Sequence, residues 1–292
     1  MIFYQISFGP YSKNNYEEAK ELVEGYLSAL VQNGQIDENY SIVPRQEQIV
    51  AYIDALGLKA NHLPFHSEMG KENLKLIGEL FGRTPVWTCN EDFPPKKNVS
   101  WKNASFLCCV TSMFDRESPI WRGDKGLIIP YFTLPITDQD KETIYFWTSR
   151  YRDHDRIWLD SHDLSMPAYR LLAEPDSSLS IEGRRCCSVI EKATGIPTYY
   201  YLTRYYGREV AEEKQRRCPG CGKPWLAEHP EKKFGDVFGE VLTFWKFDFM
   251  CKKCRLVSHG APNVNLRYAK IGEPRKNPRS LPQSPPRKQG EQ

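Results

Sequence analysis

Two short stretches decide the fold of this chain: RRCPGCGKPW at residues 216–225 and FDFMCKKCRLVS at residues 247–258. Each contains a Cys-x-x-Cys pair, and 29 residues lie between the two pairs. A Cys-x-x-Cys turn directs both sulfur atoms toward one metal ion. Gly220 and Gly222 permit the tight turn that the first pair requires. Together the two turns predict four thiolate ligands, from Cys218, Cys221, Cys251 and Cys254.

Four thiolates in a tetrahedral shell are typical of zinc, and iron in a rubredoxin-like site is the alternative. The sequence before the second pair, KKFGDVFGEVLTFWKFDFM at 232–250, and RLVSHG at 255–260 both indicate β-strands. This layout is typical of a zinc ribbon. We therefore predict one structural Zn²⁺, and such an ion contributes about 10–16 kcal/mol of apparent binding energy to folding.

The predicted ribbon is rich in aromatic side chains, and a fold this small needs them for its core. They are Trp225, Phe244, Trp245, Phe247 and Phe249. The alternation of TFWKFDF further predicts that Phe247 and Phe249 face one way, with Lys246 and Asp248 facing the other.

Two other cysteine chemistries compete with a structural metal. A redox Cys-x-x-Cys needs a thioredoxin-like setting, and the second pair disfavours it. A zinc-dependent nucleobase deaminase uses a His-x-Glu element with Pro-Cys-x-x-Cys, and His229 and Glu231 precede the second pair. However, Met250 stands where that motif has proline, and four thiolates leave no coordination position for a catalytic water.

The net charge of +3 is distributed unevenly along the chain. Residues 1–207 carry 22 Lys and Arg against 27 Asp and Glu, whereas residues 208–292 carry 18 against 10. A basic C-terminal third predicts an anionic partner, with DNA or RNA first, although it can also serve only as a solubilising tail. The candidate phosphate-binding residues beside the cysteines are Arg216, Arg217, Lys223, Lys252, Lys253 and Arg255.

The rest of the chain alternates strand and helix patterns and predicts an α+β or α/β body. Strands are predicted at 2–8, 84–89, 105–114, 126–136 and 198–207, helices at 15–34, 66–82, 140–162 and 179–195, and a strand or short helix at 47–56. Asn15 and Ser67 are the predicted N-caps, and Gly34, Gly82 and Gly195 the predicted helix ends.

These patterns divide the chain into three segments: a mixed body at 1–207, a zinc ribbon at 208–269 and a disordered, basic, proline-rich tail at 270–292. Near the N-terminus we find no basic region followed by an apolar run, and no stretch is apolar enough for a membrane helix. We therefore expect a cytoplasmic protein without a membrane partner. The neighbouring pairs Cys108–Cys109 and Cys186–Cys187 are expected to be buried packing residues because adjacent side chains diverge.

The chain resembles a family of uncharacterised bacterial proteins that contain a zinc ribbon and are suspected of binding nucleic acid. The resemblance depends on GIPTYYYLTRYYGR at 195–208, followed by CPGCGKPW and FDFMCKKCRLVS. It implies zinc binding by the four cysteines and nucleic-acid binding as the function. The open alternatives are a protein-interaction or regulatory module, such as an inhibitor, and an enzyme whose site lies in the body, for which the sequence shows no motif.

Overall fold

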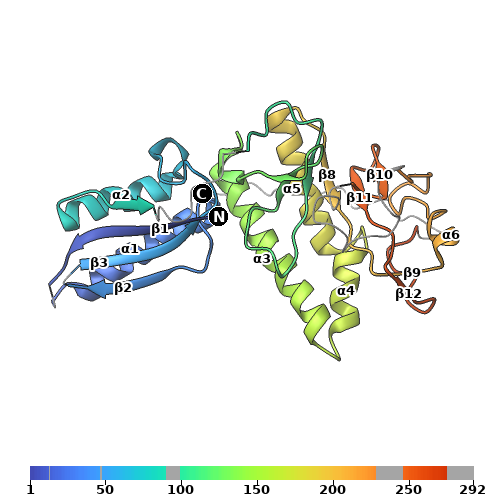
Figure 1. Ribbon diagram of the computed structural model, residues 1–292, viewed down its shortest axis with the longest axis horizontal. Coiled ribbons are helices and arrows are strands. Elements are labelled where there is room, and N and C mark those ends of the chain that lie inside the picture. The colour runs from blue at the N-terminus through green and yellow to red at the C-terminus, as the bar shows by residue number, and fades with distance from the viewer. Residues whose placement is uncertain (13, 47, 90–98, 228–245, 275–292) are drawn as a thin grey trace, which may run out of the picture.

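The protein has a mixed α+β fold in the computed structural model, which describes residues 1–12, 14–46, 48–89, 99–227 and 246–274. In Figure 1 the N-terminal sheet and its helices lie at one end of the molecule, a group of helices lies in the middle, and strands of the C-terminal region lie at the other end. In the described residues, no helix combines the length and apolar composition needed to cross a membrane.

The N-terminal part follows the order strand, helix, two strands, helix, strand. Its elements are β1 (Ile2–Pro10), α1 (Tyr16–Gln32), β2 (Ser41–Arg45), β3 (Gln48–Ala55), the 3₁₀ turn η1 (Leu63–Phe65), α2 (Glu68–Phe81) and β4 (Val86–Cys89). The strands form an antiparallel sheet in the order β2-β3-β1-β4, the split β-α-β arrangement. Residues 47–56, open between strand and helix in the sequence, are largely strand.

Both helices pack on one face of this sheet. Ile6 and Phe8 of β1 share a core with Leu27 of α1 and Ile77 of α2, and all four are fully buried. Alternate strand residues therefore point to the opposite face, away from the helices.

Helix boundaries largely follow the predicted caps. Ser67 Oγ accepts a hydrogen bond from Gly70 N at 3.2 Å, and Gly82 ends α2 with φ +66°. Asn15 is the N-cap residue of α1, as predicted, but its side chain makes no capping hydrogen bond. Its Oδ1 instead accepts a hydrogen bond from Ser12 N at 2.7 Å, which closes the preceding turn.

The second part is built on a six-stranded sheet in the order β10-β11-β8-β5-β6-β7. Its elements are β5 (Leu107–Cys109), β6 (Ile120–Arg122), β7 (Leu127–Ile128), the 3₁₀ turn η2 (Tyr131–Thr133), α3 (Asp138–Asp160), α4 (Ser165–Ala173), α5 (Ser178–Thr194), β8 (Thr198–Tyr201), β10 (Phe249–Cys251) and β11 (Leu256–Ser258). The predicted strands at 105–114 and 126–136 are much shorter than expected. Pro130 interrupts the second of them because proline has no N–H for the ladder.

The hairpin β10–β11 carries the second cysteine pair and belongs to the same sheet as β5 and β8. β11 pairs in parallel with β8, with Leu256 opposite Tyr200. The predicted ribbon is therefore joined to the body by backbone hydrogen bonds, and the division at 207 and 208 stays a prediction.

The last described segment contradicts part of the predicted tail. The short strand β9 (Tyr206–Gly207), which precedes helix α6 (Val210–Glu213), pairs in parallel with β12 (Asn263–Val264). Residues 270–274 pack against the body: Ile271 is buried, and its carbonyl accepts a hydrogen bond from Arg204 Nη1 at 2.6 Å. The tail prediction for 275–292 lies outside the described residues.

Candidate metal centre

The four predicted ligands meet at one point. The sulfur atoms of Cys218, Cys221, Cys251 and Cys254 all lie within 4.8 Å of one another. The Sγ atoms of Cys221 and Cys251 are 3.7 Å apart. In a tetrahedral site with Zn–S bonds of about 2.3 Å, neighbouring sulfurs are about 3.8 Å apart. The donor set and its spacing therefore fit a single zinc ion held by four thiolates.

The first turn is formed by its own backbone. Cys218 N donates a hydrogen bond to Lys223 O at 2.9 Å, and Gly222 N donates to Cys218 O at 2.8 Å. Gly222 adopts φ +70°. A Cβ on Gly220 would lie 2.9 Å from the Cys254 sulfur, so the absence of a side chain at Gly220 allows the second turn to approach closely. Both glycines are needed, as predicted, but for different reasons.

The second turn has the same shape with a different residue at its end. Cys254 N donates to Cys251 Sγ at 3.4 Å, and Arg255 takes the left-handed conformation with φ +52°. The Arg255 guanidinium binds Glu191 of α5, with Nε–Oε2 at 2.8 Å and Nη2–Oε1 at 2.7 Å. These hydrogen bonds lower the pKa of Glu191. A helix of the body thus holds the second turn in place.

The centre lies at the edge of the main core of the second sheet. Cys218 and Cys251 are buried, and Trp225 and Phe249 belong to the same core. Burial raises the pKa of Cys218, and burial with the neighbouring thiols raises that of Cys254 to about 12. A metal ion has to displace protons from these thiols, so its affinity rises with pH.

The predicted aromatic core is confirmed for the residues that the structure describes. Trp225, Phe247 and Phe249 are all buried, whereas Phe244 and Trp245 lie outside the described residues. The predicted facing was wrong. Phe249 contributes to the core beside the cysteines, whereas Phe247 packs on the other side of the sheet with Tyr201. β10 begins only at Phe249, so the alternation of a strand does not extend back to Phe247.

The six candidate basic residues fall into two groups. Arg217, Lys223, Lys252 and Lys253 are exposed around the cysteines. Arg216 is buried: its guanidinium lies 4.3 Å from the Phe249 ring centroid and donates to Ser258 Oγ at 3.0 Å. Arg216 and Arg255 are therefore held by contacts within the protein.

Arg216 is one member of a buried ionic cluster that the sequence did not indicate. Glu213 lies between Arg204, at 2.9 Å from Nε, and Arg216, at 3.2 Å from Nε. Burial raises the pKa of Glu213, but the hydrogen bonds and charge of Arg204 together with the charge of Arg216 outweigh it and leave the pKa below its ordinary value. Removing one partner would leave a buried charge uncompensated, so the cluster fixes the chain that enters the first cysteine turn.

The remaining cysteine predictions have separate outcomes. Cys108 and Cys109 are buried on opposite sides of the sheet, and Cys186 and Cys187 are buried in α5, as expected for packing residues. His229 and Glu231, the residues that a deaminase would need, lie outside the described residues.

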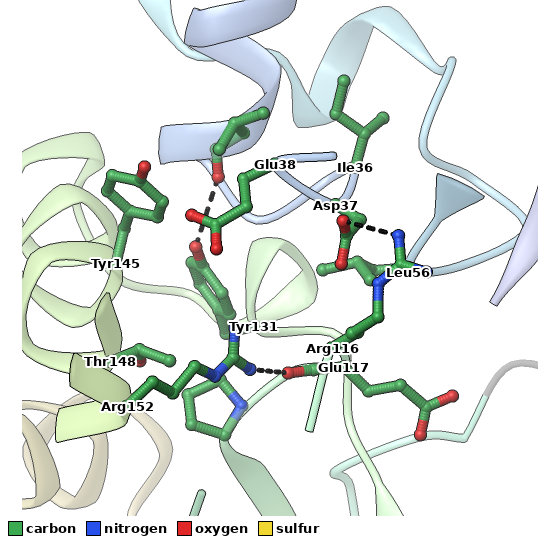
Figure 2. A pocket seen from close by; sticks show the side chains of 12 residues that line it. Ile36, Asp37, Glu38, Leu56, Arg116, Glu117, Tyr131, Tyr145, Thr148 and Arg152 are labelled. Carbon is green, nitrogen blue, oxygen red and sulfur yellow. Dashed lines mark hydrogen bonds and ion pairs between the residues drawn. The ribbon is translucent and has the colours of Figure 1, made fainter. Parts of the chain in front are cut away.

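A pocket lies where the N-terminal part meets the second part (Figure 2). Its charged groups are paired: Arg116 with Asp37 at 3.0 Å, and Arg152 with the Glu117 carbonyl at 2.8 Å. Burial and then the charge of Glu38 raise the pKa of Tyr145. The cavity of about 30 Å³ has room for about one or two water molecules. The ion pair between Arg116 and Asp37 joins the two parts of the molecule.

Comparisons with known proteins match two consecutive parts of the chain. Residues 101–203 match a family model described as a domain of unknown function, DUF2310, and residues 207–264 match a second domain of unknown function, DUF8594. Two uncharacterized proteins of Haemophilus influenzae strain Rd are each 29% identical over 170 residues, or 58% of this chain. The aligned region spans 78% of one relative and 60% of the other. No solved structure matches. The chain is thus similar to bacterial proteins whose descriptions assign no activity.

Proposed function

We propose that the protein binds nucleic acid through the exposed basic residues around a structural zinc ion. The observation that carries the proposal is the position of Arg217, Lys223, Lys252 and Lys253. All four are exposed on turns whose cysteine sulfurs converge on one point. An ion bound there fixes the backbone of both turns, so these four cations are held close together. Clustered Lys and Arg side chains bind phosphates and release counterions.

The metal in this proposal has a structural role. The four sulfurs lie within 4.8 Å of one another and would form a complete tetrahedral shell around the ion, which leaves no coordination position for a substrate or a water. Zinc would hold the hairpin β10–β11 against the first turn and extend the sheet of the body. The basic side chains, and not the ion, would contact the partner.

The test is the salt dependence of binding to single-stranded and duplex DNA and RNA, measured by fluorescence anisotropy. Four phosphate contacts predict that log K falls with log[salt] with a slope of about −3 for single strands. The variant Lys252→Glu/Lys253→Glu should weaken binding of every sequence and reduce the slope by about one for each contact removed.

The matched control is Lys20→Glu/Lys75→Glu, which makes the same charge change on helices α1 and α2. These lysines lie beside Glu24 and Glu79, away from the cysteines. The proposal is wrong if no binding occurs at low salt, or if the control weakens binding as much as the cysteine-side variant. Co-purification of a stoichiometric protein would favour an interaction module instead.

A further inference from the structure

The N-terminal sheet has one covered face and one open face. The helices cover the face of Ile6, so the open face of β1 carries Phe3, Gln5 and Ser7. Apolar side chains on this open face are exposed: Phe3 by 38%, Val43 by 39% and Val86 by 52%. Exposed apolar side chains gathered on one face are typical of a binding surface.

Two aromatic rings lie side by side on the central strands of the open face. Phe3 comes from β1 and Tyr52 from β3. The backbone register places Gln5 opposite Tyr52 and Phe3 opposite Asp54, so the two rings are diagonal neighbours. Their centroids are 6.0 Å apart and their planes differ by 10°. The two rings are therefore close together and nearly parallel on the open face.

The charge on this face suits an anionic ligand. Arg45 Nη1 lies 3.5 Å from the Tyr52 hydroxyl, and Arg83 Nη2 lies 3.3 Å from Ser7 Oγ. Among the described residues of the four strands, Asp54 is the one acidic residue, and it pairs with Arg116 at 3.4 Å. The acidic residues of α1 and α2 belong to the helix side: Glu17, Glu18, Glu21, Glu24, Glu68, Glu72 and Glu79.

We propose that the open face of the N-terminal sheet is a binding site for single-stranded nucleic acid. Unpaired bases stack on Phe3 and Tyr52, and the adjoining phosphates lie against Arg45 and Arg83. Four-stranded sheets bind single strands in this way, since every base has a face that can stack on an aromatic ring. A duplex hides those faces and is excluded. The site shares no residue with the cysteine centre and goes beyond the function proposed above.

The experiment titrates labelled uridine and deoxythymidine oligomers, with a duplex as reference, against wild type, Phe3→Ala, Tyr52→Ala and Tyr52→Phe. Each alanine variant should lose roughly 5- to 150-fold in affinity, whereas Tyr52→Phe keeps the ring and its binding. The salt slope should stay unchanged because stacking releases no counterions. Val43→Ala and Val86→Ala on the same face are the matched controls and should bind as wild type.

This result separates the two proposals. The alanine variants of the sheet should lower the affinity without changing the slope of log K against log[salt]. Lys252→Glu/Lys253→Glu should change that slope. Unchanged affinity in both alanine variants, an equal loss in the valine controls, or an equal loss of duplex affinity in the alanine variants would overturn the sheet site and leave the cysteine-side proposal standing. Binding of both oligomers assigns recognition to bases and phosphates and not to the 2′-hydroxyl.

Photocrosslinking of wild-type protein to thiouridine- and thiothymidine-containing oligomers gives a second readout that does not depend on how the variants fold. Crosslinked peptides from 2–10 or 48–55 support the sheet site. Crosslinks confined to 208–274 overturn it, as does the absence of crosslinks when a stoichiometric protein is bound to the face instead.

Discussion

The two cysteine turns reach the same geometry by different means. Each ends in a residue with left-handed backbone, Gly222 at φ +70° and Arg255 at φ +52°. Glycine adopts this conformation freely, whereas a residue with a Cβ loses about 1–2 kcal/mol. The second turn offsets this cost with contacts that the first lacks: Arg255 binds Glu191 and donates to the Lys252 carbonyl at 2.8 Å.

The difference shows that the first turn is specified locally and the second by the body. Glu191 belongs to α5, and its Oε2 also accepts a hydrogen bond from Thr198 N of β8 at 3.1 Å. One carboxylate therefore joins a helix, a strand and the second turn. The geometry of the second cysteine turn therefore depends on the folded body.

Loss of the metal should have the largest effect. Both cysteine turns should unfold, and the difference between them should disappear. Cys218→Ser removes a ligand from the proposed zinc centre, and a structural zinc ion contributes about 10–16 kcal/mol of apparent binding energy. We expect loss of bound zinc in metal analysis and loss of amide protection in residues 216–225 and 249–258. The control Cys89→Ser alters a cysteine of β4, outside the centre. Full amide protection in metal-free protein would contradict a structural role.

Next in size are the glycines of the first turn. Gly220→Ala places its Cβ 2.9 Å from the Cys254 sulfur and should cost about 1–3 kcal/mol of overpacking. Gly222→Ala meets no atom within 4 Å but pays about 1 kcal/mol for its positive φ. Urea denaturation measures both. Gly78→Ala, inside α2 with free space around it, should instead stabilise the protein. The same sign at all three positions would contradict the turn geometry.

The smallest effect concerns Arg255. Arg255→Gly loses the ion pair but relieves the backbone, so the change in unfolding free energy should stay within about 1 kcal/mol, because the pair is partly exposed. Arg255→Ala loses the ion pair and keeps the backbone strain, so it should be less stable than the glycine variant by about 1 kcal/mol. Lys253, without a positive φ, is the control, and there alanine should be the more stable. If alanine and glycine are equal at 255, backbone strain does not distinguish the two turns.

Features whose cause is local could be predicted from the sequence. The spacing of Cys218 and Cys221, with Gly220 and Gly222, encodes a turn that closes through its own backbone. The ends of helix α2 are likewise determined by nearby residues: Ser67 caps its N-terminus and Gly82 ends it. Such features depend on neighbours along the chain, so a single sequence carries them.

The tertiary structure alone decided which charges face solvent and which strands pair. Arg216 and Arg255 look like Lys252 and Lys253 in the sequence, yet one is buried against Phe249 and the other binds a carboxylate 64 positions away. The pairing of β11 with β8, and the meeting of Phe3 with Tyr52, likewise join segments distant along the chain. Contacts of this kind depend on how whole elements pack, and no local pattern records them.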